Sequence, residues 1–161
     1  MRSVTNIVIA GLGGQGVLTA SDIVADVALH AGFDVKKSEL HGMSQRGGSV
    51  ASDVRFGREV FSPMVPEGEA DFLVVVEADQ LSVNATALRP SGIVVDPSQF
   101  HAEKLRNKKC LNVALLGALS RHLEFSEDAW IAAIKRRLPE KLMEVNLEAF
   151  ALGRGAFSGP A

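Results

Sequence analysis

The stretch NIVIAGLGGQG, residues 6–16, decides the fold expected for this chain. Its first half, NIVIAG, is a short run of β-branched and small apolar residues, which is typical of a buried parallel strand. Its second half fits the pattern G-x-G-x-x-G through Gly11, Gly13 and Gly16. Residues 17–32 then carry apolar side chains at helical spacing and close with a glycine. A strand, a glycine turn and a helix in this order predict an α/β unit.

The glycine turn is the first candidate binding site. The backbone amides at the start of the following helix favour a phosphate or carboxylate, but Gly14 and Gln15 make the turn richer in polar amide than is usual for a standard dinucleotide site. The same glycines also allow a strand and a helix to pack closely with no ligand. The candidate binding residues here are Gly11, Gly13, Gly14, Gln15 and Gly16.

Two lysines argue against a standard dinucleotide site at this turn. Lys36 and Lys37 stand near the end of the second predicted strand, where NAD binding needs a carboxylate for the ribose. Glu39 comes later and Glu77 ends another strand, and either is a poor substitute. The sequence therefore favours a glycine turn that serves some other purpose.

The rest of the chain continues the alternation of strands and helices. Further strands are expected at residues 33–40, 49–57, 70–78 and 92–96, and further helices at 79–89, 111–123, 126–138 and 139–153. Residues 58–63 are expected to pair back on the third strand through a tight turn at Gly57 and Arg58.

This order of elements predicts an α/β fold, a Rossmann-like three-layer sandwich with helices on both faces. The linker at residues 41–48 is too short for a parallel crossover, which needs roughly a dozen residues. The second and third strands must then be antiparallel, so the sheet is expected to be mixed but mostly parallel. We expect one domain over residues 1–153 and a loose tail at 154–161, with Gly153 ending the last helix.

Composition excludes several kinds of function. The chain has 161 residues, a net charge of −2 and mixed acidic and basic residues, so nothing favours nucleic-acid binding. Cys110 is the only cysteine, and the histidines show no metal-ligand spacing, so an iron–sulfur or zinc site cannot be built from this chain alone. The apolar run at the N-terminus is too short for a signal peptide or a membrane span. We expect a cytoplasmic protein.

Two longer stretches together resemble a known family. GLGGQGVLTA (11–20) and ELHGMSQRGGSVASDVRFG (39–57) are similar to the gamma-type domain of the 2-oxoacid:ferredoxin oxidoreductases. The likeness is strongest to the small beta subunits of the indolepyruvate enzymes and their aryl-2-oxoacid relatives, including the phenylglyoxylate type. It extends over most of the chain, and its later marks are ADFLVVVEADQL (70–81), LNVALLGAL (111–119) and PEKLMEVNLEAFALG (139–153).

The resemblance implies an enzyme that works only as a complex. Such complexes oxidatively decarboxylate a 2-oxoacid to an acyl-CoA, using thiamine diphosphate with magnesium, and iron–sulfur clusters carry electrons to ferredoxin or another acceptor. The gamma-type domain supplies neither the thiamine site nor the cluster cysteines, which agrees with the single Cys110. The chain is thus expected to hold no cofactor by itself, to need a larger partner subunit, and to serve indolepyruvate, phenylpyruvate or phenylglyoxylate oxidation.

The same resemblance gives a role to the loop at residues 41–48. Ser44, Gln45 and Arg46 offer hydroxyl, amide and guanidinium donors at one point, and Gly47 lets the backbone approach a neighbour closely. The loop fits the edge of an active site that another subunit completes. Arg46 would meet a phosphate of coenzyme A or a carboxylate of the partner. The alternative is a loop braced internally, with Arg46 paired to a nearby acid, Glu39 or Asp53.

Two other functions stay open on the sequence. One is a stand-alone NAD(P)-dependent oxidoreductase, and the other is a regulatory module that binds a nucleotide or an acyl-CoA. The chain has no tyrosine, so the first would have to work without a Tyr–Lys proton relay. The elaborate loop at 41–48 argues more weakly against the second.

Overall fold

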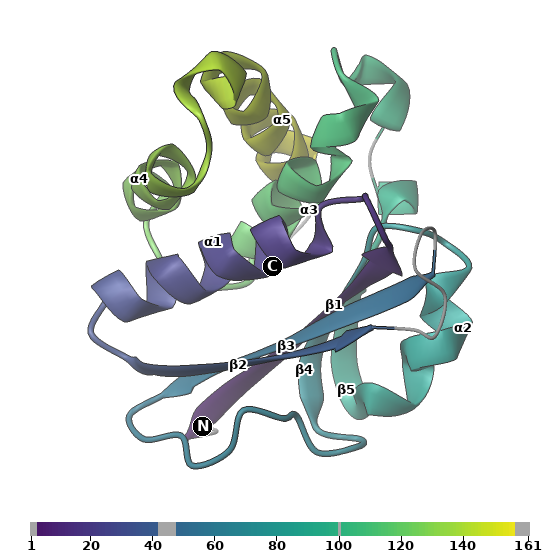
Figure 1. Cartoon of the computed structure of the whole chain (residues 1–161), viewed down its shortest axis with the longest axis vertical. Helices are drawn as coiled ribbons and strands as arrows, with labels where there is room; N and C mark the ends of the chain where they lie inside the picture. Colours follow the sequence, from purple (N-terminus) through teal and green to yellow (C-terminus); the bar gives the residue numbers. More distant parts are fainter. Residues whose placement is uncertain (1–2, 42–47, 100, 157–161) are drawn as a thin grey trace.

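The structure, a computed structural model, describes residues 3–41, 48–99 and 101–156 and is built on one five-stranded sheet (Figure 1). The sheet has the order β2-β3-β1-β4-β5. Its strands are β1 (Val4–Leu12), β2 (Asp34–His41), β3 (Ser49–Gly57), β4 (Ala70–Val75) and β5 (Leu88–Val95).

The directions of the strands confirm the expected fold class. β3 is antiparallel to both of its neighbours, β1 and β2, whereas β1, β4 and β5 pair in parallel. Every strand of the sheet except β3 therefore runs in one direction, which is the mixed, mostly parallel sheet predicted from the short linker at 41–48.

The helices are divided unequally between the two faces. Figure 1 shows the longer helices gathered on one side of the sheet: α1 (Val17–His30), α3 (Leu111–Ser120), α4 (Glu127–Arg137) and α5 (Met143–Ala156). The short α2 (Gln80–Asn84) and the segment 58–69 cover the other face, where Leu81 and Val65 pack on buried residues of β1 and β4. Single turns of 3-10 helix are η1 (Ala85–Ala87), η2 (Pro97–Gln99), η3 (Ala102–Lys104), η4 (Lys108–Cys110) and η5 (Glu140–Leu142).

The central strands form because their side chains are buried on both faces. In β1, Ile7 and Ile9 join the main core beneath the long helices, and Val8 and Ala10 join the smaller cluster on the other face. Each of these residues is at most 3% exposed. A continuous apolar run therefore serves this strand better than an alternating pattern.

The expected ends of two helices are confirmed. Gly32 has a φ of 95°, and the Phe33 amide donates to the Ala28 carbonyl at 3.1 Å, which closes α1 with a left-handed glycine. Ser126 is the N-cap of α4, and its Oγ accepts the Ala129 amide at 3.1 Å.

The expected strand at residues 58–63 is wrong. Both edges of β3 are occupied, by β2 and β1, so this segment has no free edge with which to pair. Side chains of the sheet hold it instead. Asp34 Oδ2 accepts the Val60 amide at 2.8 Å, and Asp53 Oδ2 accepts the Val65 amide at 2.8 Å.

The helix expected at residues 79–89 is shorter than predicted. It ends as η1 at Ala87, and β5 begins at Leu88. Pro90 and Gly92 therefore lie inside β5 and do not end a helix. Because β5 is an edge strand, a proline without an amide donor is tolerated there.

The helix end expected at Gly153 is also wrong, because α5 continues to Ala156. A side chain at Gly153 would place its Cβ 1.7 Å from the Ala114 carbonyl oxygen of α3. Gly117 has the matching role on α3, where a Cβ would lie 2.1 Å from the Phe150 carbonyl oxygen. Gly117 and Gly153 are thus packing glycines of the same helix pair.

The first residues of the expected tail belong to this helix. Arg154 donates to Ser120 Oγ at 2.8 Å and lies 3.6 Å from a carboxylate oxygen of Glu127. Residues 157–161 lie outside the described residues. Within the part of the chain that the structure describes, no helix has the length and apolarity needed to cross a membrane.

Candidate functional site

The glycine turn lies at the carboxyl end of β1 and leads into α1. The Gln15 amide donates to the Leu12 carbonyl at 3.1 Å, and Gly14 has a φ of 89°, which the third residue of a type II turn requires. Gly16 is the N-cap of α1 with a φ of 77°. The predicted strand–turn–helix unit is therefore present, and its glycines serve backbone geometry.

The side chain of Gln15 bridges two strands. Its Oε1 accepts the Leu12 amide at 2.7 Å, and its Nε2 donates to Glu77 Oε2 at 2.8 Å. Glu77 comes just after β4, the parallel neighbour of β1. We call this set of contacts, from Leu12 through Gln15 to Glu77, the Gln15 bridge. The amide that the sequence suggested for a ligand is engaged within the chain.

A second polar side chain reaches the turn from α3. Asn112 Nδ2 donates to the Gly16 carbonyl at 3.0 Å, and the Asn112 side chain is 6% exposed. A Cβ at Gly16 would lie 2.3 Å from that Nδ2 atom, so a glycine is needed there for steric reasons as well as for its φ.

Neither Glu77 nor Asn112 was identified as a partner of the turn from the sequence. Two signals were available. Glu77 follows the end of β4 with only Val76 between them, and Asn112 is the polar residue in an otherwise apolar helix start. Both come from segments remote in the chain, 62 and 96 residues from their partners.

The turn also holds the end of the loop at 41–48. The Gly13 amide donates to the Gly48 carbonyl at 2.9 Å, directly before β3 begins. The other candidate residues, Ser44, Gln45, Arg46 and Gly47, lie outside the described residues, as does any internal pairing of Arg46.

The two acids suggested as internal partners of Arg46 have other contacts. Asp53 accepts the Val65 amide, and Glu39 Oε1 lies 3.2 Å from Lys37 Nζ. Burial raises the pKa of the Asp53 carboxyl, against the smaller opposing effects of the Val65 amide and Arg55.

The sheet order does not fit a dinucleotide site. In a Rossmann fold β2 lies beside β1, which brings the ribose-binding acid close to the glycine turn. Here β3 lies between them, which moves the end of β2 about 5 Å further away.

The lysines also differ from their expected place. β2 extends to His41, so Lys36 and Lys37 lie in its first half and not near its carboxyl end. Lys36 Nζ lies 3.2 Å from Asp34, and Lys37 is paired with Asp22 on α1 as well as with Glu39. These cations neutralise carboxylates of the chain itself.

The described residues contain no group of three or more His, Cys, Asp or Glu side chains that could bind a metal ion. Cys110 is 4% exposed, and burial raises the pKa of its thiol, opposed in part by Arg106. A buried thiol of raised pKa is a poor ligand and a poor nucleophile, so Cys110 is a packing residue.

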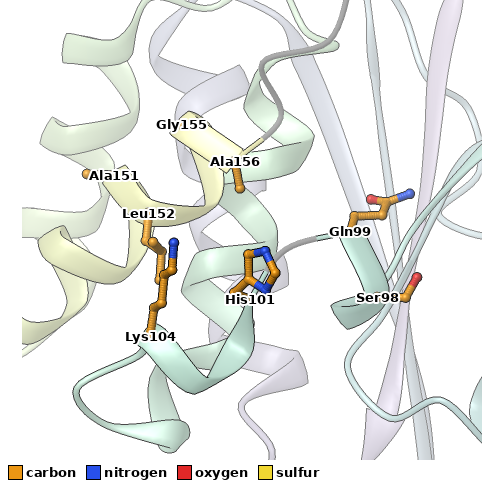
Figure 2. A pocket seen from close by; sticks show the side chains of 8 residues that line it. All are labelled: Ser98, Gln99, His101, Lys104, Ala151, Leu152, Gly155 and Ala156. Carbon is orange, nitrogen blue, oxygen red and sulfur yellow. The ribbon is translucent and has the colours of Figure 1, made fainter.

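A hollow of about 480 Å³ lies between the segment after β5 and the end of α5, and Figure 2 shows the side chains that line it. Several of its polar groups already have partners: Ser98 bonds to Asp96, and His101 lies 3.1 Å from Glu103. The residues on the opposite side of the hollow belong to α5 and are small or apolar. The lining residues are Ser98, Gln99, His101, Lys104, Ala151, Leu152, Gly155 and Ala156.

Comparison with known proteins identifies the chain. Residues 6–156 match the family described as pyruvate ferredoxin/flavodoxin oxidoreductase. The chain belongs to this family. The indolepyruvate oxidoreductase subunit IorB of Thermococcus kodakarensis is 37% identical, over 92% of this chain and 93% of that subunit. The resemblance seen in the sequence is thereby confirmed, including the expectation of an enzyme subunit.

Two solved structures of oxidoreductases share the fold. The 2-oxoglutarate:ferredoxin oxidoreductase of Magnetococcus marinus, solved with 2-oxoglutarate, coenzyme A and succinyl-CoA, superposes with a TM-score of 0.83 at 19% identity, covering 100% of this chain and 32% of that one. The gamma subunit of a keto/oxoacid ferredoxin oxidoreductase from Geobacter sulfurreducens superposes with a TM-score of 0.72 at 24% identity, covering 95% and 98% of the two chains.

Proposed function

We propose that this protein is the small subunit of an oxidoreductase complex that oxidatively decarboxylates an aryl 2-oxoacid, with indolepyruvate as the first substrate to test, to an acyl-CoA. The observation that carries the proposal is the 37% identity to an indolepyruvate oxidoreductase subunit over nearly the whole of both chains. Phenylpyruvate and phenylglyoxylate are the related substrates to compare with it, and ferredoxin is the proposed electron acceptor.

The redox groups of such a complex belong to a larger partner subunit in this proposal. An iron–sulfur cluster needs several thiolates, whereas this chain has one cysteine, and that one is buried. The residues of this chain therefore do not fit a cluster. Thiamine diphosphate and its magnesium ion are likewise assigned to the partner.

The contribution of this chain is then to complete the edge of the active site or of the coenzyme A site. The glycine turn is braced by Glu77 and Asn112 and in turn holds Gly48, so it supports the end of the loop at 41–48. We assign Ser44, Gln45, Arg46 and Gly47 to contacts with coenzyme A or the partner. Within the turn, Gly14 is the open position, because a Cβ there would meet no described atom within 4 Å.

Reconstitution tests the proposal. The chain is co-expressed with a candidate large thiamine-binding chain from the same genome, and assembly is measured by size-exclusion chromatography. Reduction of ferredoxin or a viologen dye is then followed with indolepyruvate and coenzyme A. We expect turnover only with both chains and both substrates. Tight binding of an acyl-CoA by the isolated chain, without assembly, would instead support a regulatory module.

Arg46→Ala tests the loop within that complex. A loop substitution away from buried features usually changes stability by about 0.5 kcal/mol or less, so we expect the isolated chain to stay folded. Loss of a charge-assisted contact at a subunit junction should cost about 2–5 kcal/mol of binding. We expect a raised KM for coenzyme A, or a complex that dissociates on dilution.

The matched control is Arg58→Ala, because Arg58 is an exposed arginine that follows the end of β3 opposite the loop at 41–48, and the strand spans roughly 26 Å at 3.3 Å per residue. It should leave assembly and the coenzyme A dependence unchanged. If Arg46→Ala behaves in the same way as this control, Arg46 has no role at the site.

A further inference from the structure

The Gln15 bridge connects two strands at the point where the glycine turn begins. The Val76 amide donates to the Ala10 carbonyl at 2.8 Å, so the parallel pairing of β1 and β4 continues to the residue before Glu77. Glu77 Oε2 then lies 2.8 Å from Gln15 Nε2, in a partly buried setting. The pairing of β1 and β4 therefore fixes the backbone from which the Glu77 carboxylate extends.

A carboxylate at this place determines how the Gln15 amide is turned. An ionised carboxylate only accepts hydrogen bonds, so the NH₂ end of the amide must face Glu77. The Oε1 end must then face the opposite way, where it accepts the Leu12 amide at 2.7 Å. A Cβ at Gly11 would lie 2.9 Å from that oxygen, so the amide fits closely against the start of the turn.

The turn needs such a brace because its backbone is otherwise permissive. Gly13 and Gly14 are adjacent glycines, and glycine loses more conformational freedom on folding than any other residue. The Gly13 amide nevertheless has to stay in place, since it donates to the Gly48 carbonyl at 2.9 Å.

We propose that Glu77 is a positioning residue of the complex, which acts through Gln15 to fix the turn at residues 12–15 and, through the Gly13 amide, the place of Gly48. The expected effect of Glu77 on catalysis rests on the proposed function. Its expected effect on the turn does not. Glu77 touches no substrate in this proposal.

An exchange of the two side chains tests the bridge. Gln15→Glu alone places two carboxylates face to face at the present 2.8 Å separation, where they repel each other. The double variant Gln15→Glu/Glu77→Gln restores both bonds. The carboxylate at position 15 still accepts from the Leu12 amide, and the bond between positions 15 and 77 is restored with its direction reversed, because the new amide at position 77 donates to that carboxylate. We expect Gln15→Glu to lose the hydrogen bond between positions 15 and 77, and the double variant to regain it.

The first readout is amide hydrogen exchange at Leu12 and Gly13 in the isolated chain. We expect exchange to be faster by roughly tenfold or more in Gln15→Glu and in Glu77→Leu, as for the loss of a hydrogen bond to a charged group. The double variant should return to within about twofold of the wild type. The control is Glu67→Leu, which removes an exposed carboxylate from the segment 58–69 and should change nothing at the turn.

The second readout is the kinetics of the reconstituted complex. We expect the single variants to raise the KM for coenzyme A roughly tenfold while kcat stays within about twofold, since the same bond to a charged group is lost. The double variant should restore the KM. Unchanged exchange in the single variants, no recovery in the double variant, or faster exchange with unchanged kinetics each overturns the proposal. A wild-type complex without turnover overturns the proposed function instead, and the exchange data still decide whether the bridge fixes the turn.

Discussion

At the scale of single residues, Gly14 and Gly16 separate two reasons for a glycine. Both have a positive φ, 89° and 77°, which residues with a side chain rarely adopt. Only Gly16 is also crowded, because its Cβ would lie 2.3 Å from Asn112 Nδ2, whereas a Cβ at Gly14 would meet no described atom within 4 Å.

Comparing Gly16→Ala with Gly14→Ala therefore measures the contact with Asn112. Both variants should lose about 1–2 kcal/mol from the left-handed backbone. Gly16→Ala should lose about 1–3 kcal/mol more, because Asn112 has to turn away and gives up its bond to the Gly16 carbonyl. The measurement is the free energy of unfolding in urea. Equal losses of unfolding free energy in the two variants would show that the Asn112 side chain moves aside without an energetic penalty.

These residues also show what the sequence can predict about the site. The spacing of Gly11, Gly13 and Gly16 predicted the turn, because a strand, a tight turn and a helix are consecutive in the chain. The partners Glu77 and Asn112 were not predicted, because they reach the turn only once β4 and α3 are in place. The purpose of Gln15, which is to brace the turn, depends on those same distant elements.

At the scale of elements, the segment 58–69 shows how two carboxylates replace strand pairing. Asp34 and Asp53 each accept an amide of the segment at 2.8 Å. Their pKa values shift in opposite directions. The Val60 amide, and then Lys36, hold the pKa of Asp34 below its ordinary value of 3.8, whereas burial raises the pKa of Asp53.

The two carboxylates should therefore stabilise the fold at opposite ends of the acid range. The contribution of Asp34 is present above 3.8 and is lost as the pH falls through its lower folded pKa. The contribution of Asp53 is present below 3.8 and is lost as the pH rises through its higher folded pKa.

Asp34→Asn and Asp53→Asn test this difference, because asparagine keeps an oxygen that accepts the segment's amide. We expect the destabilisation by Asp34→Asn to shrink on acidification, and the stability of the wild type relative to Asp53→Asn to grow. Urea unfolding between about pH 3 and 7 measures both trends. Parallel trends in the two variants would contradict the assigned shifts.

The contact between α3 and α5 gives the third prediction. Gly153→Ala would place a Cβ 1.7 Å from the backbone oxygen of Ala114, so the helices must separate, at a cost of about 1–3 kcal/mol or more. Gly155→Ala, two residues further along α5, meets no described atom within 4 Å and should be neutral or stabilise by up to about 1 kcal/mol. Thermal and urea unfolding of the pair measure the difference. A similar stability of the two variants would mean that the helix pair adjusts freely.

The elements that were predicted correctly are those whose pattern is local. β1 and β4 are apolar runs buried on both faces, and polar and apolar residues alternate in β3 from Asp53 to Phe56, so each could be identified without its neighbours. The errors at residues 58–63, at the end of the helix expected over 79–89 and at Gly153 have one physical cause. They depend on which strand edges are free and on which helix lies against which, and these are properties of the whole sheet.

At the scale of the whole molecule, the position of β3 separates this fold from a dinucleotide-binding one. A glycine turn of the pattern G-x-G-x-x-G follows β1 in both. In this chain β3 lies between β1 and β2 and begins at the residue after Gly48, which the turn holds. The place from which a ribose-binding acid would act is thus taken by an antiparallel strand.

We therefore expect the isolated chain to bind neither NAD(H) nor NADP(H) with micromolar affinity. Three features support this expectation: β3 separates β1 from β2, Gln15 is engaged by Leu12 and Glu77, and the two lysines of β2 are paired with carboxylates. NADP(H) is the stricter test, because a lysine released from its partner offers a cation for the 2′-phosphate. Titration calorimetry at low salt measures both cofactors, with a nicotinamide-dependent dehydrogenase as the positive control. Micromolar binding of either cofactor would favour a stand-alone NAD(P)-dependent oxidoreductase over a subunit without its own cofactor.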